Sequence, residues 1–174
     1  MQLRPATVRD IGHIASIQAR NWQRVYAGTY DQGYLDDEVE RDRLEVWTDR
    51  IARPEPTFDT TVADDGTGTV VGYVHAVVDH DRRWGTLVDS LHVAEDHARQ
   101  GIGRALMRHA ADLVANRGRS PALHLWVLDD NVAAQVFYTA LGGERLDSEL
   151  QPAPRDQEAV AVRYVWRRAA DLLA

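Results

Sequence analysis

The sequence predicts an α/β fold in which a central mixed β-sheet has helices on both faces. The first observation is that the apolar spacing changes repeatedly along the chain between the helical period and the alternation of a strand. The second is a strand–helix–strand–helix stretch from Thr86 to Leu141, which requires a parallel connection. The third is that runs typical of antiparallel hairpins stand on both sides of this stretch. Because 174 residues suffice for one core, we expect a single domain, 1–174.

Each element follows from a local pattern. The first helix is expected to start near Val8, because Thr7 stands three residues before Asp10 and the two can cap each other. Two β-rich runs flank the turn Asp64–Gly68, which predicts a hairpin. Helices are expected at 8–26, 36–52, 102–116 and 131–141. Strands are expected at 2–4, 60–63, 69–78, 86–93, 123–128, 144–149 and 159–167.

The composition excludes several classes of function. The chain has no cysteine, so disulfides, thiolate metal sites and a cysteine nucleophile are ruled out. All 20 basic residues are arginine, which also excludes a Schiff-base lysine. The histidines lack metal-ligand spacing, and no metal site is expected. The formal charge of −7 disfavours nucleic acid and would suit a cationic substrate, although it is equally typical of ordinary soluble proteins.

The chain shows no signal for a membrane or for secretion. The first ten residues contain no apolar run followed by a small-residue cleavage site. No apolar stretch approaches the roughly 20 residues that span a bilayer. We therefore expect a cytoplasmic protein without membrane contact.

The most informative segment is Gln100–Leu106, in which two glycines follow a predicted strand and open a predicted helix. Glycine lets several backbone N–H groups face one point, and the helix dipole adds partial positive charge there, so the turn predicts a phosphate ligand. Arg99 and Arg104 can add charge. A dinucleotide site would need a third glycine, but position 106 is Leu106, and a Walker loop would need lysine. The alternative is a glycine turn that serves only helix–strand packing.

A second segment, Asn131–Gly142, begins three residues after the strand that ends near Leu128. Together with Leu91–Val93 and Gln100–Leu106, its pattern of Asn131, Ala134, Phe137-Tyr138 and Leu141-Gly142 resembles the GNAT superfamily of acyl-CoA-dependent N-acetyltransferases. The resemblance covers nearly the whole chain in element order, while residues match over about 91–142. It implies the GNAT-like mixed sheet and acetyl-CoA as cosubstrate.

The resemblance also implies where acetyl-CoA binds. The cosubstrate would lie in a V-shaped gap where the strand ending at Val93 and the strand ending near Leu128 separate. An amide of the strand near 91–93 would polarise the thioester carbonyl while a neutral amine attacks it directly. The residues expected to bind acetyl-CoA are Leu91, His92, Val93, Arg99, Gln100, Gly101, Ile102, Gly103, Arg104, Ala105, Asn131, Ala134 and Tyr138.

Tyr138 is the expected catalytic acid. By the resemblance, it would give a proton to the departing CoA thiolate. Its ordinary pKa of about 10 keeps the hydroxyl protonated at neutral pH. The alternative is a helix tyrosine that packs beside Phe137.

Asp89 is the candidate base for the amine. Family members often use a glutamate on the strand before the glycine turn, and Asp89 is the nearest match. The alternating pattern predicts that it shares one face with Leu87, Leu91 and Val93. The alternative is a solvated carboxylate at the strand end or an ion pair with an arginine. His75, His92 and His124 lie on predicted strands and could serve as the base instead.

The acceptor amine is not identified by the sequence. Trp22, Tyr26, Tyr30 and Tyr34 could form an aromatic wall for it or could pack the first helix onto the sheet. Acidic residues at 31 and 36–38 could attract a cationic acceptor or could only solvate a loop. Relatives are frequently dimers, and the closing hairpin offers an edge for a homodimer. The alternative to an enzyme is a non-catalytic acyl-CoA sensor or partner-binding module with the same fold.

Overall fold

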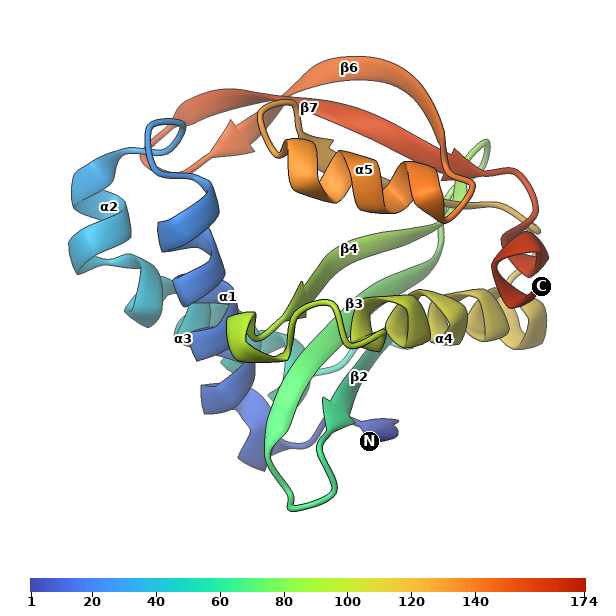
Figure 1. The fold of residues 1–174 in the computed structure, drawn as a ribbon, viewed down its shortest axis with the longest axis horizontal. Coiled ribbons are helices and arrows are strands. Elements are labelled where there is room, and N and C mark those ends of the chain that lie inside the picture. Colours follow the sequence, from blue (N-terminus) through green and yellow to red (C-terminus); the bar gives the residue numbers. More distant parts are fainter.

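Seven strands form one mixed sheet in the order β1-β2-β3-β4-β5-β7-β6 (Figure 1) in the computed structural model, which describes residues 1–174. The strands are β1 (Gln2–Pro5), β2 (Phe58–Asp64), β3 (Val70–Asp81), β4 (Gly85–Val93), β5 (Leu123–Leu128), β6 (Glu144–Ala153) and β7 (Gln157–Trp166). The helices are α1 (Ile11–Val25), α2 (Gln32–Asp37), α3 (Val39–Ala52), α4 (Ile102–Arg117) and α5 (Val132–Ala140). None of the helices has the length and apolar character needed to cross a bilayer.

The strands β4 and β5 form the only parallel pair, and they pair over a short distance. Their register joins Thr86 to Leu123 and Leu87 to His124, with no further pairing toward their carboxyl ends. The other neighbours in the sheet are antiparallel. The strands therefore separate beyond Leu87, as the expected V-shaped gap requires.

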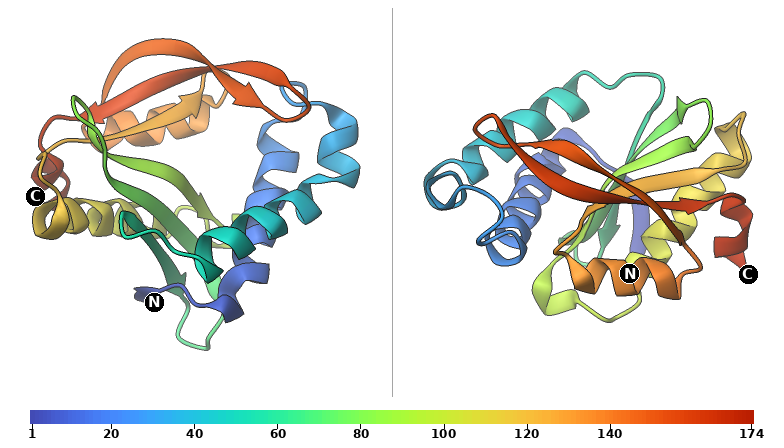
Figure 2. Two further views of the ribbon diagram at one scale, coloured as in Figure 1. Left: turned by 180° about the vertical axis from the view of Figure 1, so that it is seen from behind. Right: turned by 90° about the horizontal axis from the view of Figure 1, so that it is seen from above.

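Helices cover both faces of the sheet, which confirms the predicted fold class (Figure 2). On one face, Ile14 of α1 and Trp47 of α3 pack against Val62 and Tyr73 of the sheet. On the other face, the apolar side of α4 joins the largest core cluster. The alternation along β2 and β3 explains this division, because successive side chains point to opposite faces.

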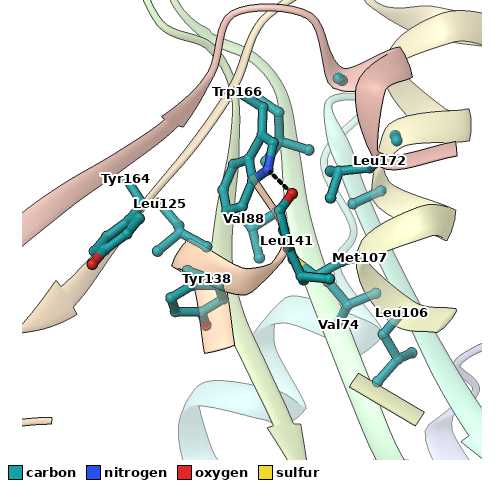
Figure 3. Packing of buried hydrophobic residues seen from close by; sticks show 14 of the residues in the cluster. Val74, Val88, Leu106, Met107, Leu125, Tyr138, Leu141, Tyr164, Trp166 and Leu172 are labelled. Atoms are coloured by element: carbon teal, nitrogen blue, oxygen red, sulfur yellow. Dashed lines mark hydrogen bonds between the residues drawn. The ribbon is translucent and has the colours of Figure 1, made fainter. Parts of the chain in front are cut away.

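The helix α5 is fixed to the sheet at its C-terminal end. The indole Nε1 of Trp166 donates to the carbonyl oxygen of Leu141 at 2.9 Å (Figure 3). A Cβ on Gly143 would lie 2.8 Å from the Trp166 ring, so only glycine fits there. Figure 3 shows the Tyr138 ring in the same core, near Leu125 of β5. The core thus sets the position of the expected catalytic tyrosine.

Several predicted boundaries differ from the structure. The first helix has a 3₁₀ turn at Val8–Asp10 before α1 begins. The segment 36–52 is divided between α2 and α3, and α2 was not predicted. Because α2 has only six residues, its sequence cannot display a helical period. The closing hairpin is longer than expected, since β6 continues to Ala153 and β7 starts at Gln157.

Candidate active site

A cavity of about 560 Å³ lies where β4 and β5 separate. Residues 87–93 of β4 form one wall and residues 125–128 of β5 form the other. Residues of α1 and α5 contribute further lining, and β3, β6 and β7 contribute single residues or pairs. Of the predicted site residues, this cavity brings together Asp89, Leu91, His92, Val93, Asn131, Ala134 and Tyr138.

The glycine turn borders this region and does not line the cavity itself. Gly101 has φ +83° and precedes the first residue of α4, whose N-terminus has no side-chain cap. Arg99 also has a positive φ, +62°, so two left-handed residues bend the backbone here. Because the first N–H groups of a helix have no partner within it, they remain free for an anion. No protein atom lies within 4 Å of a Cβ built on Gly101, so the space in front of the turn is open.

The turn lies against α5, which connects it to the cavity. A Cβ on Gly103 would lie 3.1 Å from Cζ of Phe137. The neighbours of Phe137 on α5 include Ala134 and Tyr138, which both line the cavity. The side chain of Ile102 is buried in the core, so only its backbone can contact a ligand.

Tyr138 reaches the cavity from α5 and is largely buried. Burial raises the pKa of its hydroxyl above the ordinary value of 10, and nearby Tyr26 raises that pKa further. The hydroxyl therefore holds its proton at neutral pH, as an acid must before it acts.

Asp89 occupies a β-bulge, and its predicted orientation is wrong. On β3, His75 pairs with Ser90 while the next residue, Ala76, pairs with Val88, so Asp89 has no partner. An inserted residue reverses the alternation beyond it. Val88 consequently joins the core with Leu91 and Val93, whereas Asp89 does not share their face.

The carboxylate of Asp89 meets an arginine. Arg50 Nη1 of α3 lies 2.6 Å from Asp89 Oδ2. Asp89 still lines the cavity, so the roles of base and ion-pair partner are both compatible with its position.

Of the three candidate histidines, only His92 lines the cavity. Burial lowers the pKa of His92 to about 4, and the charge of Arg43 contributes. The amide Nδ2 of Asn21 donates to the Val93 carbonyl at 3.0 Å and lies 3.4 Å from His92 Nδ1. The ring is thus neutral, with Nδ1 already facing a donor. His75 and His124 instead contact Thr60 and the Trp84 carbonyl.

Two polar residues of α1 at the cavity were not predicted. Gln18 and Asn21 are buried and point from α1 toward β4. Gln18 accepts from Trp47 Nε1 at 2.7 Å and donates to Ser90 Oγ at 3.4 Å. The available signal was their spacing of three residues, which places two amides on the apolar face of a predicted helix.

The aromatic residues predicted near the acceptor divide into two groups. Trp22, Tyr26 and Tyr30 contact one another, with ring centroids 4.9 to 5.9 Å apart, and line the cavity. Tyr34 does not line it, because its ring is buried among α1, α2 and α3 and its hydroxyl bonds to Asp42.

The architecture is that of N-acetyltransferases of known structure. One similar structure is PaiA N-acetyltransferase from Thermoplasma acidophilum, solved with coenzyme A. The alignment covers 92% of this chain and 96% of the PaiA chain, with 16% sequence identity and a TM-score of 0.70. Ribosomal-protein-alanine N-acetyltransferase from Brucella melitensis aligns over 95% of this chain and 99% of its own chain, with 20% sequence identity and a TM-score of 0.70. A phosphinothricin acetyltransferase from Sinorhizobium meliloti, solved with acetyl-CoA, aligns over 97% of this chain and 89% of its own chain, with 19% sequence identity and a TM-score of 0.69.

The chain itself belongs to the acetyltransferase (GNAT) family, whose model matches residues 18–142. This range includes the end of α1, the bulged strand β4, the glycine turn and α5. No curated protein matches the chain in sequence. The resemblance inferred from Leu91–Val93, Gln100–Leu106 and Asn131–Gly142 is therefore confirmed at the level of family and fold.

Proposed function

We propose that this protein is an N-acetyltransferase that transfers the acetyl group of acetyl-CoA to a primary amine of a small molecule, peptide or protein. The observation that supports it most is the open glycine turn at Gly101 beside a cavity formed by the separation of β4 and β5. Two of the similar structures contain coenzyme A or acetyl-CoA, which supports the same cosubstrate here.

The residues present fit such a cosubstrate. The free N–H groups at 101–104 would bind the pyrophosphate, with Arg99 and Arg104 adding positive charge. The backbone of Leu91–Val93 would pair with the pantetheine arm, and one of its amides would polarise the thioester carbonyl. Asn131 caps α5 by accepting from the Ala134 N–H at 3.2 Å, which orders the opposite wall.

The reaction needs no covalent intermediate with the protein. The amine nitrogen attacks the thioester carbonyl, a C–N bond forms, and the C–S bond breaks. Tyr138 gives its proton to the leaving thiolate, since burial keeps the hydroxyl protonated until then. Asp89, directly or through water, takes the proton that the attacking nitrogen loses.

Calorimetric titration with acetyl-CoA and with CoA tests whether the protein binds the cosubstrate. Incubation with acetyl-CoA and a panel of amines tests acetyl transfer, because each transfer releases CoA, whose free thiol can be detected. The chain has no cysteine, so the protein contributes no thiol background. Binding with turnover of an amine supports the proposal, and failure of folded protein to bind acetyl-CoA refutes it. Binding without turnover of any amine would favour the non-catalytic acyl-CoA sensor or partner-binding module instead.

We also propose a cellular location, a domain organisation and an assembly for the protein. We place it in the cytoplasm, with residues 1–174 acting as one catalytic domain. Nucleic acid is not among its partners, given a formal charge of −7. A homodimer would use the exposed edge of β6, and sedimentation of the purified protein tests that assembly.

A further inference from the structure

The end of the cavity nearest α2 has an aromatic lining. Trp22, Tyr26 and Tyr30 come from α1 and the loop after it, and Trp126 comes from β5. We call these four residues the aromatic end. Tyr26, Tyr30 and Trp126 also pack against an apolar cluster centred on Leu128. Tyr138, the expected catalytic acid, lines the same cavity as these four residues.

Charged groups at the cavity are already paired. Only two lining residues, Arg24 and Asp89, carry a formal charge at neutral pH if the histidines are neutral. Asp89 pairs with Arg50 at 2.6 Å, and Arg24 lies 3.5 Å from Glu95. The lining itself therefore offers no free carboxylate for a second positive charge on an acceptor. Asp130, which lies outside the lining near Tyr26 and Tyr30, accepts a hydrogen bond from the Thr29 hydroxyl.

A guanidinium already occupies a ring face at this end. The Cζ atom of Arg43, which does not line the cavity, lies 4.4 Å from the Trp22 ring centroid. This guanidinium is also paired with Asp42 at 2.7 Å, so a second cation would have to displace a held arginine to stack on that ring face. The surroundings of Trp22 thus favour an uncharged aromatic or apolar group over a polycation.

The β6–β7 hairpin covers the aromatic end. Figure 1 shows the hairpin extending across to α2. At its tip, Arg155 pairs with Asp31 and with Glu38, the latter at 2.6 Å. Gln151 and Pro152 of β6 line the cavity beneath this connection. The ion pairs thus join the hairpin tip to Asp31 and Glu38, at the two ends of α2, across this end of the cavity.

From these contacts we infer that the acceptor is a small amine with an aromatic body, recognised by the aromatic end and not by charge. The inference rests on the proposed function and narrows its acceptor class. The aromatic body would lie among Trp22, Tyr30 and Trp126, and the amine would point toward Tyr138. Polyamines and extended peptides would be poor acceptors.

The test compares three probes with saturating acetyl-CoA: 2-phenylethylamine, spermidine, and a hexapeptide with an N-terminal alanine and no aromatic residue. CoA release gives kcat and KM, and tryptophan fluorescence reports binding without turnover. We expect kcat/KM for 2-phenylethylamine to exceed that for either other probe at least tenfold. Trp22→Leu should raise KM for 2-phenylethylamine about tenfold or more. Trp84→Leu, whose indole lies outside the cavity, is the matched control and should leave KM unchanged.

The outcomes distinguish failure of the proposed acetyltransferase function from failure of the aromatic-acceptor inference. Loss of acetyl-CoA binding in folded wild-type protein would refute the proposed function. If acetyl-CoA binds, a preference for spermidine or the peptide overturns only the aromatic acceptor. Equal effects of Trp22→Leu and Trp84→Leu overturn it as well. So does acetyl-CoA binding with neither turnover nor fluorescence change for 2-phenylethylamine.

Discussion

The substitution Gly101→Ala separates a role in phosphate binding from a role in folding. Gly101 has φ +83° with no protein atom within 4 Å of the added Cβ, so alanine meets no clash and only backbone strain. A left-handed alanine costs about 1–2 kcal/mol relative to glycine. For a chain of this size, that cost lowers Tm by roughly 2–8 °C. The methyl group would also stand in the space in front of the turn, where the pyrophosphate is expected.

Gly66 provides a matched control for this substitution. It has φ +99°, again with no atom within 4 Å of a Cβ, but it lies in the β2–β3 turn. Thermal unfolding should show similar losses for Gly66→Ala and Gly101→Ala. Calorimetry should show acetyl-CoA affinity reduced at least tenfold, about 1.4 kcal/mol, in Gly101→Ala alone. Equal acetyl-CoA affinities in the two variants would refute the phosphate role of the turn.

Three further predictions concern side chains. Tyr138→Phe should lower kcat about 100-fold with acetyl-CoA affinity unchanged, as judged by steady-state kinetics and calorimetry, and an unchanged kcat would remove the acid role. Asp89→Asn should lower kcat/KM about tenfold or more at neutral pH if the carboxylate is the base. Equal pH–rate profiles for the wild type and the variant would show that the Asp89 carboxylate is only an ion-pair partner of Arg50. Arg4 donates hydrogen bonds to Asp10 and, with the Thr7 hydrogen bonds, lowers the pKa of that carboxyl from 3.8 to about 2. The lowered pKa contributes about 2 kcal/mol to the free energy of unfolding, a contribution that is present above pH 4 and is lost as pH falls toward 2. Urea unfolding should therefore show Asp10→Asn less stable than wild type at pH 6 and nearly equal to it at pH 2; a constant difference would contradict the linkage.

The cofactor side of the site was predictable because its signals are local. Gln100–Leu106 places two glycines between a strand and a helix, and Asn131–Gly142 places a cap, an aromatic pair and a stop signal in one helix. Each pattern needs only its own segment to be recognised. The structure places α5 at the cavity and the glycine turn beside α5, and the family comparison covers both.

The orientation of Asp89 was not predictable from alternation. A β-bulge inserts one residue without changing the composition of the strand, so the apolar pattern of β4 contains no sign of it. Only the pairing of His75 and Ala76 with Ser90 and Val88 shows that Asp89 is the inserted residue. The prediction failed because strand register depends on the neighbouring strand.

The acceptor side depends on contacts between residues that are distant in sequence. The acidic residues at 31 and 36–38 suggested attraction of a cation, yet Arg155, more than a hundred residues later, pairs with both Asp31 and Glu38. The same pairing brings the β6–β7 hairpin over Trp22 and Tyr30. A formal charge of −7 for the chain therefore says little about the charge that an acceptor would meet. Because one arginine holds Asp31 and Glu38 while Asp36 and Asp37 have no ion pair, the charge of this segment depends on tertiary contacts that its own sequence does not contain.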